Sequence, residues 1–127
     1  MLKKTITYKD FDGNERTEDF YFHISEAEAI KMELGKSGGL SARINQIISA
    51  QDVPEIMEVF EDLIKKSYGV KSLDGREFIK SEELYRSFAQ TNAYSKFFME
   101  LCTEEGAAAD FVNAILPNGG AVITENK

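Results

Sequence analysis

The first 22 residues alternate between apolar and polar side chains in two runs. The runs 2–8 and 15–22 flank an Asp12-Gly13 turn, in which Gly13 and Asn14 tolerate the positive φ angles of a tight turn. Two alternating runs around such a turn predict an antiparallel β-hairpin. Because a two-stranded hairpin is barely stable alone, we expect its apolar face to pack on helices or on another chain.

From residue 25 onward, apolar residues recur at the spacing of α-helices. Ser25 and Glu28 have the spacing of a capping box, in which each side chain binds the backbone amide of the other. This predicts a helix that begins here and ends before the Gly-Gly pair at 38–39. The next periodic stretch predicts a short second helix up to about Ala50.

The third predicted helix has the strongest signals at both ends. Asp52 precedes Pro54, a residue suited to the first helical turn, and Gly69 is expected to form a left-handed cap at the other end. One face of this helix is apolar and consists of Ile56, Val59, Phe60, Leu63 and Ile64.

Three more helices are predicted in the last third of the chain. Ser81 and Thr91 can each cap one of them, and Thr103 can start a final helix that Pro117 ends. Before these helices, residues 70–79 surround an Asp-Gly turn, and Val70 and Phe78-Ile79 are placed to pair as a minimal hairpin.

The pattern therefore predicts a mainly helical α+β fold, with an N-terminal β-hairpin followed by five to six short helices. At 127 residues the chain fits one domain. We expect this single globular domain to cover 1–117, with the hairpin at 1–22 and the helices over 25–117. The Gly-rich and polar stretch 118–127 is expected to be a flexible tail.

Charge and composition narrow the classes of function. The chain has 22 acidic and 15 basic residues, a net charge of −7, which disfavours binding to nucleic acid or to anionic membranes. No run of 18 apolar residues and no secretion-signal pattern is present in the sequence, so we expect a cytoplasmic protein. Cys102 is the sole cysteine, so an internal disulfide is excluded.

No combination of residues supports catalysis, metal binding or a cofactor. His23 is the only histidine, and Cys102 has no nearby histidine or basic cluster, so both are expected to be structural. The segment 10–14 resembles the start of a calcium loop, but its glycine is fourth and not sixth. We therefore expect no enzyme activity and no bound cofactor.

Aromatic residues provide the candidate interaction sites. Phe20, Tyr21 and Phe22 are consecutive, so rings lie on both faces of the second strand, and one face then needs a partner chain. The alternative is that a longer helix of the same chain covers the second face. Tyr94 and Phe98 are further candidates, although a core role is favoured for both.

An ordered set of segments between residues 3 and 117 carries a family resemblance. They are Thr5-Ile6-Thr7-Tyr8, Asp12-Gly13, Glu18-Asp19-Phe20-Tyr21-Phe22, Gly38-Gly39-Leu40, Tyr68-Gly69-Val70-Lys71-Ser72, Asp74-Gly75-Arg76, Phe78, Ser81-Glu82-Glu83-Leu84, Ala93-Tyr94-Ser95, Ala107-Ala108 and Phe111. Together they resemble the tail assembly chaperones of long-tailed (siphovirus-type) bacteriophages and prophages of Gram-positive bacteria.

The resemblance implies a non-enzymatic protein of the host bacterial cytoplasm. Such chaperones bind the tape measure protein, keep it soluble, and help tail tube protein to polymerise around it. The edge of the predicted hairpin, and not the resemblance, makes self-association a further expectation. A different hypothesis is an acidic phage inhibitor that mimics nucleic acid and blocks a host nucleic-acid-binding protein. The scattered carboxylates make this second hypothesis weaker, and a small enzyme is the weakest of the three.

Overall fold

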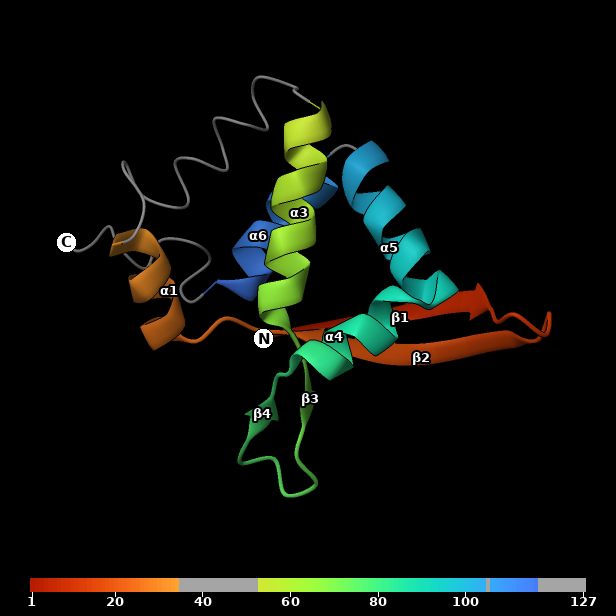
Figure 1. Ribbon diagram of the computed structural model, residues 1–127, viewed down its shortest axis with the longest axis horizontal. Helices are drawn as coiled ribbons and strands as arrows, with labels where there is room; N and C mark the ends of the chain where they lie inside the picture. Colours follow the sequence, from red (N-terminus) through yellow and green to blue (C-terminus); the bar gives the residue numbers. More distant parts are fainter. Residues whose placement is uncertain (35–52, 105, 117–127) are drawn as a thin grey trace.

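The computed structural model describes residues 1–34, 53–104 and 106–116 (Figure 1). Within these ranges the chain forms five helices and a four-stranded antiparallel sheet. The elements are β1 (Leu2–Lys9), β2 (Glu15–Phe22), α1 (Glu26–Leu34), α3 (Val53–Ser67), β3 (Tyr68–Lys71), β4 (Phe78–Ile79), α4 (Glu82–Ala89), α5 (Asn92–Thr103) and α6 (Ala107–Ile115). The predicted helix ending near Ala50 and the predicted tail 118–127 lie outside the described residues.

The predicted N-terminal hairpin is confirmed and is part of a larger sheet. Strands β1 and β2 pair along their whole length, from Leu2 opposite Phe22 to Lys9 opposite Glu15. Strand β3 then adds to the free edge of β2 over two residue pairs and turns back into β4, giving the order β1-β2-β3-β4. The predicted minimal hairpin of Val70 with Phe78-Ile79 is thus confirmed, and its two strands interrupt the helical region 25–117.

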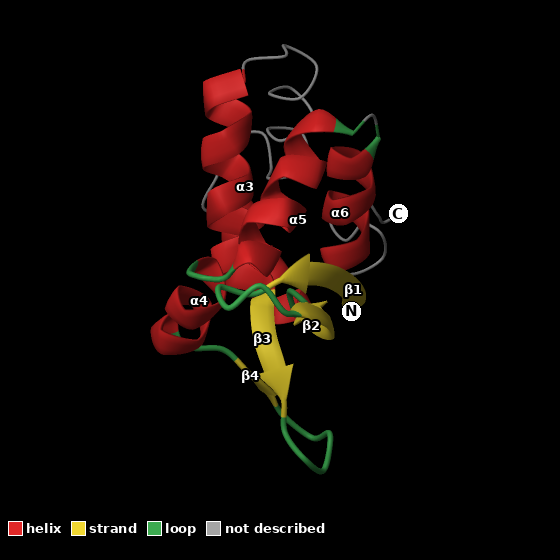
Figure 2. Cartoon of the chain, turned by 90° about the vertical axis from the view of Figure 1, so that its right-hand side faces the viewer, coloured by secondary structure: helices red, strands yellow, loops and turns green. Residues whose placement is uncertain are grey.

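The helices and the second hairpin lie on different sides of the first hairpin. Helices α3, α5 and α6 stand on one side of β1 and β2, whereas the β3–β4 hairpin projects away from them (Figures 1 and 2). Alternation along β2 explains this layering, because Phe22 is fully buried under the helices while the preceding residue points to the opposite face.

An aromatic cluster fills the space between the sheet and the helices. The ring of Phe22 stacks on Phe97 of α5 at a centroid distance of 5.0 Å and meets Phe111 of α6 edge-on at 5.8 Å. The rest of the core is aliphatic or aromatic and consists mainly of Ile6, Ile24, Phe60, Leu63, Ile64, Phe88, Leu101, Val112, Ile115 and Leu116. One continuous core therefore joins both ends of the described chain.

Local capping signals place three helices as predicted. The backbone amide of Ser25 donates to Glu28 Oε1 at 2.8 Å, and the amide of Glu28 donates to Ser25 Oγ at 3.1 Å, so the capping box is formed. Ser81 Oγ accepts from the third amide of α4, and Thr91 Oγ1 accepts in the same way in α5.

Two predictions about helix ends are wrong. Gly69 is not a left-handed cap but lies within β3, where the positive-φ region is not used. A Cβ atom there would lie 2.6 Å from the Phe78 ring, so close approach requires the glycine. The last helix does not start at Thr103, which ends α5; it starts after Gly106, whose φ of 82° turns the chain.

Side chains of α5 occupy part of the free edge of β1. The backbone oxygen of Lys9 accepts a hydrogen bond from Asn92 Nδ2 at 2.9 Å, and the oxygen of Thr7 accepts one from the Lys96 ammonium. Strand edges are otherwise templates for pairing with other chains. The C-terminal half of this edge is therefore already hydrogen-bonded to side chains of α5.

Candidate interaction surfaces

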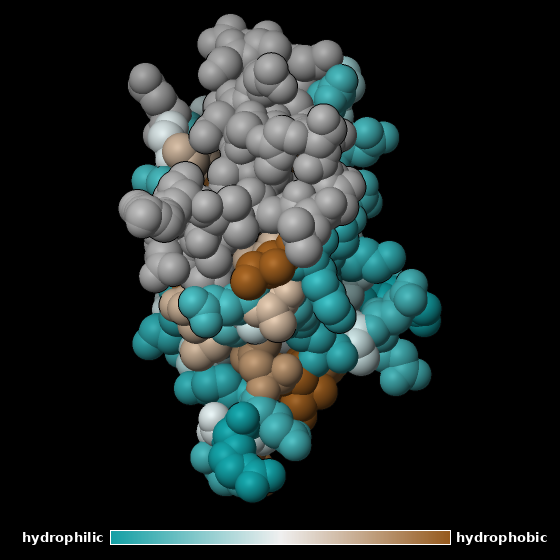
Figure 3. Space-filling view, turned by 90° about the vertical axis from the view of Figure 1, so that its left-hand side faces the viewer, coloured by the Kyte–Doolittle hydropathy of each residue, from teal (hydrophilic) through white to brown (hydrophobic). Residues whose placement is uncertain are grey.

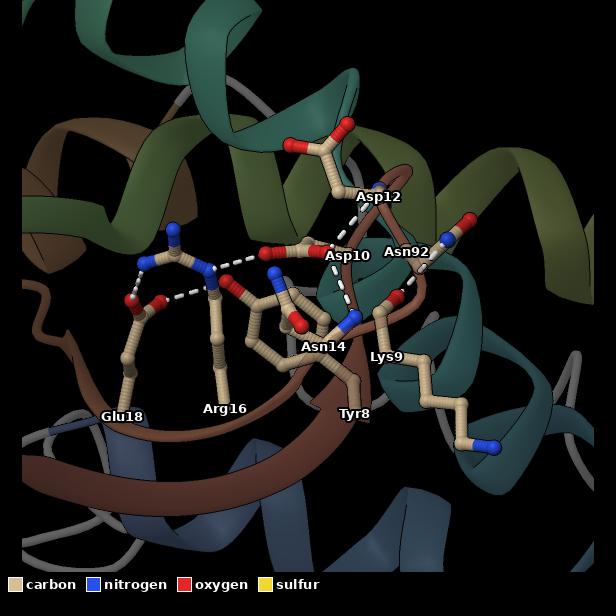
Figure 4. Close-up of polar contacts among 8 residues, drawn as sticks. All are labelled: Tyr8, Lys9, Asp10, Asp12, Asn14, Arg16, Glu18 and Asn92. Carbon is tan, nitrogen blue, oxygen red and sulfur yellow. Dashed lines mark hydrogen bonds and ion pairs between the residues drawn. The ribbon is translucent and has the colours of Figure 1, made fainter.

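Asp10 organises the turn between β1 and β2 (Figure 4). Its Oδ1 accepts hydrogen bonds from the backbone amides of Asp12 and Asn14, each at 3.0 Å, and its Oδ2 lies 2.7 Å from Arg16 Nε. The Arg16 guanidinium and the amide donors hold the pKa of Asp10 below its ordinary value. The fixed turn presents the ring of Phe11, which is 79% exposed.

The turn between β3 and β4 is fixed in a similar way. Asp74 Oδ1 accepts from the backbone amide of Arg76 at 3.1 Å and from the Ser72 hydroxyl at 2.8 Å, and these donors lower the pKa of Asp74. Ser72 Oγ also accepts from the amide of Glu77 at 3.0 Å. The residue at the tip, Leu73, is fully exposed. Both hairpins therefore present an apolar side chain directly before an Asp-Gly pair.

The β3–β4 hairpin exposes more apolar surface below its tip. Val70 and Ile79 are cross-strand partners, so their side chains lie on the same face, and they are 40% and 44% exposed. In the view of Figure 3, apolar atoms form a strip that reaches down toward this hairpin, and polar atoms flank its lower part. An apolar patch with a polar border is typical of a protein-interaction surface.

A groove of about 290 Å³ lies between β1, α5 and α6. Phe97, Leu101 and Phe111 are buried core residues that also form its apolar floor. The remaining apolar lining comes from Leu2, Ala107 and Ala114. The groove therefore combines the first strand of the chain with its last two described helices.

The rim of this groove is acidic. Glu100, Glu104 and Asp110 lie along it, and Lys4 is the only basic residue among the described residues of the lining. The Lys4 ammonium binds Glu100 Oε2 at 2.5 Å and stands 5.9 Å from the centre of the Phe97 ring. Within the described ranges, Glu104 and Asp110 have no ion-pair partner, so the rim keeps a negative field.

The three aromatic candidates of β2 have different environments. Phe22 is fully buried, and Phe20 packs on Phe88 at a centroid distance of 4.9 Å. Tyr21 is half-buried on the opposite face of the sheet, where Lys71 Nζ lies 4.8 Å from its ring centre. Only Tyr21 therefore points away from the helices, and the strand beside it comes from the same chain.

Tyr94 and Phe98 lie one helical turn apart on α5. Their rings stack at 5.8 Å with an interplanar angle of 12°, and Tyr94 also meets Tyr85 edge-on. Burial and the hydrogen bond with Tyr85 raise the pKa of Tyr94 well above its ordinary value. Both rings are packed against the core but keep some exposed surface.

Sequence reasoning missed the exposed apolar residues of the second hairpin. Leu73, Val70 and Ile79 were assigned only to a turn and its flanks, without a functional role. A usable signal was present in Leu73-Asp74-Gly75, because a large apolar residue next to a turn pair cannot be buried by its own short hairpin.

The described residues contain no group of side chains that could hold a metal ion. None of their helices has the length and apolar character needed to cross a membrane.

Burial raises the pKa of the Cys102 thiol, which disfavours the reactive thiolate. His23 contacts Phe78 edge-on at 5.9 Å, and burial lowers its pKa. These features are those of structural side chains.

Comparison with protein families gives one match. A family model described as phage tail assembly chaperone matches residues 1–121, which is nearly the whole chain. Comparisons with curated proteins and with solved structures gave no match. The matched range includes both projecting hairpins and all the residues that line the groove.

Proposed function

Because the chain belongs to the phage tail assembly chaperone family, we propose that it acts in the host bacterial cytoplasm as a non-enzymatic chaperone for the tape measure protein. It binds this long client, keeps it soluble, and promotes assembly of the tail tube protein around it. The phage is a siphovirus or related prophage of a Gram-positive host. The family match over residues 1–121 is the observation that carries this proposal.

The surfaces of the molecule support a client-binding role. Tape measure proteins need a partner for apolar stripes, and this chain exposes Val70 and Ile79 beside each other on a projecting hairpin. Tyr21 lies on the other face of the sheet and adds an aromatic contact. The net charge of −7 favours the solubility of a complex with an apolar client.

Co-expression with a tape measure fragment from the same phage tests the function. We expect the fragment to move from the insoluble to the soluble fraction and to co-purify with this chain. A parallel experiment uses the tail tube protein. Empty pull-downs with both proteins, from a correctly folded chaperone, would show that the proposal is wrong.

Variants on the outer face of β2 locate the contact. Tyr21→Lys should weaken co-purification, because it replaces an aromatic ring with a charge on a face that the helices leave open. Thr17→Lys is the matched control, since Thr17 is an exposed residue on the same face of the same strand. Binding by both variants at the level of the unchanged protein would exclude this face as the client surface.

A further inference from the structure

The outer edge of β1 is hydrogen-bonded to its own chain along only part of its length. In an antiparallel ladder the N–H and C=O groups of one residue point to the same side, and this side alternates along the strand. The backbone oxygens of Thr7 and Lys9 face away from β2, so the backbone groups of Lys3 and Thr5 face outward as well. Among the described residues, none hydrogen-bonds to these outward groups of Lys3 and Thr5. This free half of the edge can therefore pair with another strand.

The groove described above opens beside the free half of the edge. Leu2 and Lys4 point to the face of the sheet that α5 and α6 cover, and both line the groove (Figure 2). In a strand added to β1, the residues opposite Leu2 and Lys4 point to the same face. Alternate side chains of such a strand therefore enter the groove while its backbone pairs with Lys3 and Thr5.

The lining of the groove selects these side chains. Phe97, Leu101 and Phe111 form the floor, so one inserted group must be apolar. Glu104 and Asp110 are exposed on the rim and have no ion-pair partner in the described part of the chain. Their charge favours lysine or arginine beside the apolar group. A second copy of this chain is a poor occupant, because two molecules that each carry a net charge of −7 repel one another.

We propose that an extended basic segment of another protein adds as a strand to the free half of the β1 edge and inserts an apolar side chain into the β1–α5–α6 groove. Lysine or arginine on the same face of this segment then lies near Glu104 and Asp110. Backbone hydrogen bonds to Lys3 and Thr5 provide affinity, and the groove provides selectivity for the side chains.

This site is separate from the surfaces on which client binding was proposed. Tyr21 lies on the face of the sheet that points away from the helices. Val70 and Ile79 belong to the second hairpin, which projects away from α5 and α6 (Figure 1). The inference therefore goes beyond the proposed function and does not depend on it.

Titration of the isotope-labelled full chain with a synthetic peptide, followed by NMR, tests the site. The probe is a short threonine peptide with a central leucine and, on the same face, one lysine to each side of it. We expect it to bind and to slow the exchange of the Lys3 and Thr5 amide protons with solvent, because these protons become hydrogen-bonded.

Two altered peptides separate the contributions of charge and backbone. With glutamate in place of both lysines, binding should weaken by about tenfold or more, since the rim repels the peptide. Methylation of the amide nitrogens that face β1 should weaken binding to a similar degree, because the side chains are kept while the backbone donors are lost.

Two proline variants compare the free half of the edge with the half that α5 holds. Thr5→Pro removes an outward N–H, and the ladder with β2 is kept, so we expect peptide binding to weaken by about tenfold. Thr7→Pro is the matched control, because its backbone faces the same way but its oxygen is already bound by α5. Each variant also loses one hydroxyl contact with β2, to Asp19 or to Thr17. Thermal unfolding checks that both retain the fold.

Reversal of the rim charge tests the selectivity of the groove. Glu104→Lys combined with Asp110→Lys should reverse the preference, so that the glutamate peptide binds more tightly than the lysine peptide. Both positions are exposed, so these changes leave the core intact.

Four results would overturn the proposal. The lysine peptide does not bind, or the methylated peptide binds equally well, or the reversed rim leaves the preference unchanged. The fourth is a self-association of the chain, seen by sedimentation velocity, that Thr5→Pro abolishes, because a second copy would then occupy the edge. If Thr5→Pro does not fold, the methylated peptide still tests strand pairing.

The peptide titration contains no tape measure protein, so the two proposals fail separately. Peptide binding together with empty pull-downs would refute the proposed function and leave the strand site standing. Successful pull-downs without peptide binding would refute the strand site alone.

Discussion

At the scale of single residues, His23 has an unusual environment. It lies where β2 leads toward α1, and its Nδ1 is buried without a hydrogen-bond partner among the described residues. Burial, the N-terminal ammonium and Lys80 lower its pKa, and Glu28 opposes them. The fold therefore favours the neutral form of this histidine.

This environment predicts a pH dependence of stability. Below the ordinary histidine pKa of 6.5 the unfolded chain binds a proton that the folded chain resists, so the free energy of unfolding falls as pH decreases from 7 toward 5. His23→Leu should reduce this slope, measured by urea denaturation at several pH values. An unchanged slope in the variant would show that other groups cause it.

Single residues also mark the limit of sequence reasoning here. A glycine after a helix usually indicates a left-handed cap, and this rule failed at Gly69 because its neighbour is the ring of Phe78, nine residues away. The rule concerns local backbone freedom, whereas this position is decided by a contact across two strands. Local patterns hold no information about such a contact.

At the scale of elements, the start of α1 is held by a short chain of polar contacts. Ser25 and Glu28 bind each other's amides, and Lys80 Nζ binds both oxygens of Glu28 at 2.9 and 3.0 Å and the backbone oxygen of Lys66 at 2.8 Å. Burial alone would raise the pKa of Glu28, but Lys80 and Ser25 lower it overall. The capping box thus connects α1 to the segment after β4.

Removal of this cap should destabilise the protein measurably. Ser25→Ala and Glu28→Ala should each lower the free energy of unfolding by about 1 kcal/mol, and the double variant should lose less than the sum because the two side chains act together. The contribution of Glu28 disappears as pH falls below its ordinary value of 4.5. Glu26→Ala, an exposed change in the same turn, is the control for urea denaturation.

Elements with local signals were predicted, and those that depend on distant contacts were not. Hairpin β1–β2 and helices α1, α4 and α5 follow from turn and capping residues close in sequence. The pairing of β3 with β2 joins Gly69 to Tyr21, and nothing in either segment indicates the other. The start of α6 was misplaced because Gly106 has no capping side chain.

At the scale of the whole molecule, the ring of Phe22 contacts residues from four other helices and strands. Phe22 contacts Tyr68 after α3, Phe88 of α4, Phe97 of α5 and Phe111 of α6, at centroid distances of 5.0 to 6.0 Å. The sequence suggested this ring as a possible partner contact, and the structure places it in the core. The fold of the whole described chain therefore depends on this position.

Phe22→Ala should lower the free energy of unfolding by about 3 to 5 kcal/mol, because it leaves a cavity among closely packed rings. Tyr21→Ala, one residue away on the opposite face, should cost much less. Urea denaturation compares the two. A similar loss in both variants would contradict the central role of the Phe22 ring.

The groove is also a property of the whole molecule. Its walls come from residues 2–4 and 97–114, which are separated by most of the sequence. Capping residues predicted helices over the later segments, but not that the first strand would lie beside them and leave a space. The candidate site was therefore visible from the sequence only as separate apolar faces.

The same arrangement has a consequence for the time course of synthesis. The ribosome makes β1 first, yet Glu100 of α5, the ion-pair partner of Lys4, lies 96 residues later, and α6 follows α5. Long-range contacts of this kind form late and slowly. The face of β1 that packs on α5 and α6 therefore stays exposed until almost the entire chain has been synthesised. During that interval the nascent chain is most prone to form wrong pairings.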